Sequence, residues 1–141
     1  MSVSAALAYR SDGQRCRLLF QVKPGSYDTA SLITFLTALR RHFCGQKVIL
    51  VWDGLPAHRS RAMTASLRTQ RAGLRVERLP SYAPELNPVE SVWGNVKGRA
   101  LANRCADALG EAAAAFQTGM GRVRRSQQLC FAFLDHAGLS F

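Results

Sequence analysis

Residues 47–53, KVILVWD, form an uninterrupted apolar run of strand length that ends in an aspartate. A strand with one face in water alternates apolar and polar side chains, whereas a strand covered on both faces is apolar throughout. The run therefore predicts a central strand with helices on either face, which indicates an α/β architecture. Asp53 would lie at the carboxyl end of that strand, where open α/β sheets place ligands and catalytic groups. The same residue could instead belong to an Asp-Gly turn that ends the strand.

Two apolar segments near the N-terminus, residues 3–9 and 16–22, are separated by RSDGQR. The Asp-Gly pair in that connection is typical of a tight turn, so the two segments predict a β-hairpin. A further strand is expected over residues 74–80, where LRVERLP ends in a proline.

Apolar residues recur at helical spacing in several parts of the chain. A first helix is expected within residues 26–44, with Asp28 or Thr29 as its N-cap. A second, basic helix is expected over about residues 60–72.

From residue 88 onward the chain is expected to be mainly helical. A third helix runs from residue 88 to about residue 102, and residues 106–138 predict two more helices with a break near Gly119 and Gly121. The order β-β-α-β-α-β-α-α-α predicts an α/β fold with a mixed sheet. A length of 141 residues predicts a single domain.

The chain is strongly basic, with a formal net charge of +10 at pH 7. Its cations are mostly arginine, because Lys23, Lys47 and Lys97 are the only lysines. A guanidinium can bind two oxygens of one phosphate at once, so this composition favours a nucleic-acid partner. A GC-rich genome that favours arginine codons would produce the same composition without such a partner.

The cysteines Cys16, Cys44, Cys105 and Cys130 are scattered, without the paired spacing of a zinc site, and are interpreted as buried, reduced thiols. The N-terminal residues lack a signal-peptide pattern, and no apolar stretch approaches the ~20 residues needed to span a bilayer. We therefore expect a cytoplasmic protein with no membrane partner.

The segment NPVE, residues 87–90, precedes the third expected helix. Asn87 fits an N-cap, Pro88 the first helical position and Glu90 the third, which together make a capping box. A second interpretation is that the surrounding prolines fix the Glu90 carboxylate at the helix entrance, facing Asp53. The two roles are compatible, because one carboxylate oxygen can cap the helix while the other coordinates a metal.

Three more polar side chains are candidates for the same cleft. Lys97 follows Glu90 by seven residues and projects within roughly 20° of it on a helix, so it could hold a phosphate near an acidic site. It could equally be a solvated surface lysine. His58, five residues after Asp53, either lines the cleft or belongs to a surface loop, and Asn87 is a further candidate.

Two segments, VWDGLPAH and LPSYAPELNPVESVWGNVKGR, carry a resemblance to a known family, and 36 residues (54–89) separate Asp53 from Glu90. Together they resemble the DDE transposases of the mariner-like superfamily, in their bacterial insertion-sequence branch. A lone Asn-Pro-x-Glu would be a weak signal, whereas the whole run behind a strand-end aspartate is specific. The resemblance extends over essentially the entire chain. In the second segment it rests on Tyr82, Pro84, Leu86, Asn87, Pro88, Glu90, Trp93 and Lys97.

The resemblance implies a ribonuclease-H-like fold, in which a mixed sheet is flanked by helices. It also implies that Asp53 and Glu90 are the second and third members of a three-carboxylate site. Such a site would hold two Mg²⁺ or Mn²⁺ ions about 4 Å apart and catalyse phosphodiester hydrolysis and strand transfer on DNA at transposon ends. One ion would activate water or a 3′-hydroxyl, and the other would stabilise the leaving oxygen.

The first member of that site has no counterpart in this chain. The family carries it on a first, central strand, whereas this chain opens with SVSAALAY, which matches the second strand. Asp12 belongs in the hairpin turn and Asp28 at a helix N-terminus, so neither replaces it. We therefore expect residues 1–141 to be a partial catalytic domain that lacks the first strand and is inactive alone. The gap would be closed by direct strand pairing, by a homodimer, or by the N-terminal part of a split transposase.

Three functions remain compatible with the sequence. The chain is either the catalytic fragment of a transposase, or a non-catalytic module that binds DNA or full-length transposase, or a decaying gene product with no function. For the first two, the candidate DNA-binding residues are Lys97, Arg99, Arg122, Arg124 and Arg125.

Overall fold

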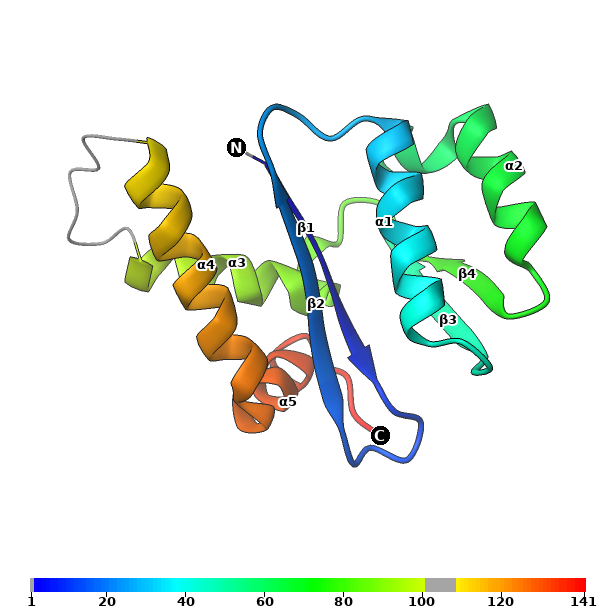
Figure 1. The fold of residues 1–141 in the computed structure, drawn as a ribbon. Coiled ribbons are helices and arrows are strands. Elements are labelled where there is room, and N and C mark those ends of the chain that lie inside the picture. Colours follow the sequence, from blue (N-terminus) through cyan, green and yellow to red (C-terminus); the bar gives the residue numbers. More distant parts are fainter. Residues whose placement is uncertain (1, 101–108) are drawn as a thin grey trace. The chain divides into compact units, whose positions relative to one another are not determined.

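The computed structural model describes residues 2–100 and 109–141. Cys105 and the expected end of the third helix at residue 102 lie outside the described residues. Cys16 and Cys130 are buried as expected, but the expectation is wrong for Cys44, which is exposed. The α/β class predicted from the sequence is confirmed, with four strands and five α-helices in the described part of the chain (Figure 1). In order these are β1 (Ser2–Tyr9), β2 (Cys16–Lys23), α1 (Thr29–His42), β3 (Val48–Trp52), α2 (Arg61–Gln70), β4 (Leu74–Arg78), α3 (Pro88–Ala100), α4 (Leu109–Arg125) and α5 (Gln127–His136).

The described residues form two compact units. Unit 1 combines the residues up to Gly25 with those from Glu85 onward, and unit 2 is Ser26–Pro84. Each unit has its own cluster of buried apolar side chains. The prediction of a single domain from chain length stays a prediction. None of the described helices is long and apolar enough to cross a membrane.

Unit 1 is built on the β1–β2 hairpin, which was predicted from the Asp-Gly turn. The strands pair antiparallel from Ser2 opposite Lys23 to Tyr9 opposite Cys16. Gly13 closes the turn with a φ of 70°, a left-handed conformation that glycine adopts without steric cost. As expected, Asp12 lies in this turn.

Helices α3, α4 and α5 pack against one another and against the hairpin. The amide side chain of Gln127 joins α5 to β2, because its Oε1 accepts from the Cys16 N–H at 2.8 Å and its Nε2 donates to the Cys16 carbonyl at 2.7 Å. The Tyr9 hydroxyl donates to the Cys130 carbonyl at 2.7 Å. Burial, followed by the charges of the nearby thiols, raises the pKa of Tyr9, so this hydroxyl stays a donor. The buried core cluster of unit 1 consists of Cys16, Leu18, Val92, Val96, Phe116, Met120, Val123, Cys130 and Phe133.

Unit 2 packs α1 and α2 against the parallel β3–β4 pair. Of the two N-cap candidates predicted from the sequence, Asp28 caps α1. Its carboxylate accepts from the Ser31 N–H at 2.8 Å. The strands pair from Val48 opposite Leu74 to Trp52 opposite Arg78. The buried core cluster of this unit consists of Leu36, Trp52 and Met63.

The expectation that β3 is covered on both faces is wrong for the described residues. Successive strand residues point to opposite faces. Leu50 and Trp52 pack into the core of unit 2, but Ile49 and Val51 on the other face are 64% and 53% exposed. A continuous apolar run indicates that both faces of the strand need to be covered. In unit 2 the core covers only the face that carries Leu50 and Trp52.

Parallel and antiparallel pairings both occur, as a mixed sheet requires, but they lie in two separate two-stranded sheets. Within the described residues β1 pairs with β2 alone, and β3 pairs with β4 alone. The direct strand pairing considered from the sequence is therefore not formed by these strands.

The predicted break near Gly119 and Gly121 is also wrong, because α4 continues through both glycines to Arg125. Ser126 interrupts the helices instead, and its hydroxyl caps α5 by accepting from the Leu129 N–H at 3.2 Å. Gly119 has a packing role. A Cβ at this position would lie 2.8 Å from Val96 Cγ1, so only glycine allows α4 to approach α3 this closely.

This packing predicts opposite effects for two matched substitutions in α4. Gly119→Ala forces a methyl group against Val96, and overpacking of this kind costs about 1–3 kcal/mol, offset by up to ~1 kcal/mol of helix propensity. Gly121→Ala would meet only the end of the Arg125 side chain, at 3.5 Å, and should stabilise the protein by about 0.5–1 kcal/mol. Urea denaturation of both variants measures whether each substitution lowers or raises the free energy of unfolding. Equal stabilisation by both would contradict the packing role of Gly119.

Candidate active site and nucleic-acid interface

Asp53 follows β3 directly, and its carboxylate is engaged on one side. Its Oδ1 accepts from the Leu55 N–H at 3.3 Å, so the side chain forms an Asx-type turn at the end of the strand. The side chain is nevertheless 44% exposed. The turn interpretation and the ligand interpretation of Asp53 are therefore compatible, because Oδ2 takes no part in the turn.

His58 is held against Asp53 rather than lying free in a surface loop. Its Nδ1 lies 2.9 Å from Asp53 Oδ1 and 2.9 Å from the Asp53 carbonyl oxygen. Both of these atoms are acceptors, so Nδ1 must carry the proton. The imidazole stacks on Trp52 with the ring centroids 4.1 Å apart and an interplanar angle of 1°. The His58 side chain is only 11% exposed, and the stack and the hydrogen bonds together fix the orientation of Oδ1.

Glu90 lies in the first turn of α3, and Asn87 caps this helix without forming the predicted capping box. Asn87 caps the helix, since its Oδ1 accepts from the Val89 N–H at 3.2 Å. The Glu90 carboxylate is exposed and has no hydrogen bond or ion pair within the described part of the chain. The reciprocal bond of the box to the Asn87 N–H is thus not made, and both carboxylate oxygens are available to a ligand.

Asp53 belongs to unit 2 and Glu90 to unit 1, and each is described within its own unit. Both offer carboxylate oxygens, which are the ligands that Mg²⁺ and Mn²⁺ prefer. Among residues 2–100 and 109–141 no cluster of three or more His, Cys, Asp or Glu side chains could hold a metal ion. Each of these carboxylates by itself is chemically suited to such an ion.

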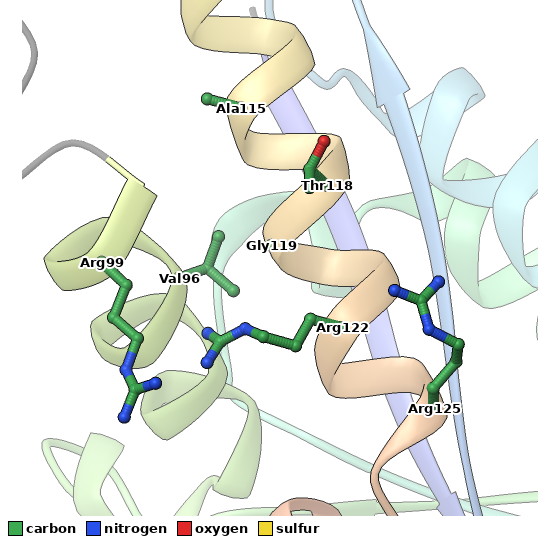
Figure 2. A pocket seen from close by; sticks show the side chains of 7 residues that line it. All are labelled: Val96, Arg99, Ala115, Thr118, Gly119, Arg122 and Arg125. Carbon is green, nitrogen blue, oxygen red and sulfur yellow. The ribbon is translucent and has the colours of Figure 1, made fainter.

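The five candidate DNA-binding residues lie on α3 and α4, and three of them line one pocket of about 330 Å³ (Figure 2). The side chains of Lys97, Arg99, Arg124 and Arg125 are exposed. Arg122 is partly buried, and its Nη2 donates to Asn95 Oδ1 at 2.6 Å. The pocket is lined by Val96, Arg99, Ala115, Thr118, Gly119, Arg122 and Arg125.

Two residues with a structural part in these sites were missed by the sequence reasoning. Trp52 supplies the surface on which His58 stacks, and its position next to Asp53 was the available signal. Asn95 orients Arg122 from another helix, 27 residues away in sequence, and no sequence pattern links the two.

Comparison with protein families gives a match to the DDE superfamily endonuclease model over residues 2–111. No curated protein matches the chain.

Among solved structures, the chain is similar to Mos1 transposase in a paired-end complex with the left transposon end, with 18% identity and a TM-score of 0.65. That match covers 96% of this chain but only 50% of the Mos1 chain. The catalytic domain of Mos1 mariner transposase matches with 18% identity and a TM-score of 0.54, over 99% of this chain and 83% of that one. Another similar structure is the Mos1 catalytic domain with Raltegravir and Mg, at the same TM-score of 0.54, 18% identity, and coverage of 99% and 83%. At this identity the similarity establishes the ribonuclease-H-like fold.

Proposed function

Because this chain belongs to the DDE superfamily endonucleases, we propose that it is the catalytic part of an insertion-sequence transposase that cleaves and joins DNA at transposon ends. Asp53 and Glu90 are proposed as its second and third catalytic carboxylates. The observation that carries this proposal is the pair itself. One carboxylate follows β3 with Oδ2 outside the turn, and the other is unpaired at the start of α3 among the described residues.

The two carboxylates are proposed to converge on Mg²⁺ or Mn²⁺, two ions in the complete site. When bound, such ions supply charge stabilisation and nucleophile activation for phosphodiester chemistry. Asp53 would bind through Oδ2, while His58 and the Leu55 N–H hold Oδ1 in place. Such outer hydrogen bonds orient a ligand and lower the cost of organising the site. Glu90 would bind with either oxygen.

The first carboxylate is proposed to come from a strand outside residues 1–141. Two features of unit 2 support this proposal. The second edge of β3 has no strand partner among the described residues, and the Ile49 and Val51 side chains beside it are exposed. An added strand would form backbone hydrogen bonds with that edge of β3. Side chains of the segment that carries it would cover the face with Ile49 and Val51. The N-terminal part of a split transposase is the proposed donor, and a homodimer is the alternative. The chain alone is proposed to be inactive.

Convergence of Asp53 and Glu90 can be measured with Mn²⁺ as a paramagnetic probe in NMR. The expected result is broadening of amide signals next to both residues, such as Gly54 and Ser91, at the same Mn²⁺ concentration. Asp53→Asn should reduce the broadening at both positions, because one ligand of a shared ion is lost. Asp12→Asn, in the hairpin turn, is the matched control and should leave it unchanged. Broadening at one residue only, or broadening that persists in Asp53→Asn, would contradict a shared site.

A non-catalytic DNA-binding role is the second candidate, and the net charge of +10 together with the arginine-lined pocket supports it. It predicts DNA binding that falls steeply with salt and no cleavage under any complementation.

A further inference from the structure

The pocket between α3 and α4 is suited to an anion. It is lined by three arginines, and no acidic side chain of the described residues lines it. Figure 2 shows Arg122 extending from α4 toward α3, the helix that carries Arg99, while the Arg125 guanidinium lies on the other side of α4. Guanidinium groups that share one opening repel each other unless an anion lies between them.

Arg122 is already oriented for such a ligand. Its bond of 2.6 Å to Asn95 Oδ1 uses one N–H of a guanidinium that has five, so others remain free to donate. A side chain held in place before binding loses less conformational entropy when the ligand arrives. The close approach of the helices at Gly119 also shapes the pocket, because a side chain there would meet Val96.

The size of the pocket restricts what enters it. A volume of about 330 Å³ lies at the lower end of the range for small-ligand pockets, about 300–1,000 Å³. A duplex cannot enter such a space, but a phosphate group that projects from a duplex can. Arginine binds phosphate with two parallel hydrogen bonds, which lysine cannot reproduce.

We propose that Arg99 and Arg122 form a phosphate site that anchors one backbone phosphate of bound DNA, with Arg125 adding charge from the other side of α4. The proposal rests on DNA being the partner, as proposed above, and it separates this pair from the more diffuse contribution of Lys97 and Arg124. An acidic protein segment is the less favoured occupant, because a carboxylate offers fewer acceptor oxygens than a phosphate and DNA is the partner proposed above.

The test compares Arg99→Gln and Arg122→Gln with Arg124→Gln in the full chain, by fluorescence anisotropy with a labelled duplex across a salt series. Arg124 is the matched control, because it is an exposed arginine of α4 outside the pocket. Each pocket variant should weaken binding by about tenfold and lower the slope of log affinity against log salt by about 1. Arg124→Gln should weaken it by no more than about threefold, through long-range charge alone. Arg122→Lys should recover only part of the loss.

The remaining outcomes separate a failure of the pocket from a failure of the DNA partner. Equal losses in all three variants would overturn the pocket while leaving DNA binding intact. If the wild-type chain binds no DNA, the proposed DNA partner is refuted. A titration with inorganic phosphate, followed through the arginine Nε–H NMR signals, then decides whether the pocket binds phosphate at all. Shifts confined to Arg99 and Arg122 would support a site for free phosphate. The absence of any shift would overturn the phosphate site. Preferential binding of poly-glutamate over DNA at the same charge would overturn the choice of a phosphate ligand.

Discussion

Replacing Asp53 with asparagine is expected to lower DNA nicking by about 1,000-fold or more, equivalent to about 4 kcal/mol, in the chain complemented with the strand that we propose carries the first carboxylate. The amide keeps an oxygen that can accept from the Leu55 N–H and from His58, so the turn at the end of β3 should persist. What is lost is the negative charge that balances a divalent ion. The effect is therefore expected on catalysis and not on folding.

The measurement is nicking of supercoiled plasmid with Mg²⁺ or Mn²⁺, with and without the complementing segment. Glu90→Gln should lose activity to a similar extent, because its exposed carboxylate is the other ligand. Glu85→Gln is the matched control, since it removes an exposed carboxylate five residues earlier and should retain activity. Full activity in the complemented Asp53→Asn protein would refute the assigned site. Robust cleavage by the uncomplemented chain, abolished by Asp53→Asn, would confirm the site and refute the inactivity of the chain alone.

Met120→Ala is expected to destabilise unit 1 by about 3 kcal/mol, within the 2–5 kcal/mol typical of emptying a buried site. Met120 has no exposed surface and belongs to the main core of that unit. The truncation removes apolar burial and leaves a cavity, because α3 and α4 are already held in close contact at Gly119 and cannot simply close around it. Such a loss is a large fraction of the 5–15 kcal/mol that stabilises a typical domain.

The two tryptophans allow this effect to be assigned to a unit, because Trp93 lies in unit 1 and Trp52 in unit 2. With Trp52→Phe as background, urea denaturation followed by Trp93 fluorescence should show the lowered midpoint. Gln117→Ala, an exposed site on the same helix, should change stability by no more than about 0.5 kcal/mol. A loss below about 1 kcal/mol for Met120→Ala would contradict the packing described for α4.

Features that depend on neighbouring residues were predicted well from the sequence. The hairpin turn at Gly13, the Asp28 cap of α1 and the Asn87 cap of α3 each involve atoms a few residues apart. Such hydrogen bonds form whatever the rest of the fold does, so a local pattern is enough to identify them. The candidate residues of the active site came instead from the resemblance to the family, because the local pattern alone left both Asp53 and Glu90 with a structural alternative.

Features that depend on distant contacts were predicted less well. Gly119 and Gly121 look alike in the sequence, and only the approach of Val96 from another helix makes one of them a packing position. The Glu90 side chain satisfied every local rule of a capping box, yet that bond is not formed. The contact between Arg122 and Asn95 joins two helices that no motif connects.

By itself, the sequence identified the family, the α/β class and the cap of α3, and it supplied the two carboxylates that we propose for the chemistry. The tertiary structure alone decided which face of β3 is covered, why α4 continues through its glycines, and which arginines share a pocket. The physical reason is the range of the interactions. Caps and turns satisfy backbone groups within one turn of the chain, whereas burial and charge clustering depend on which distant surfaces meet.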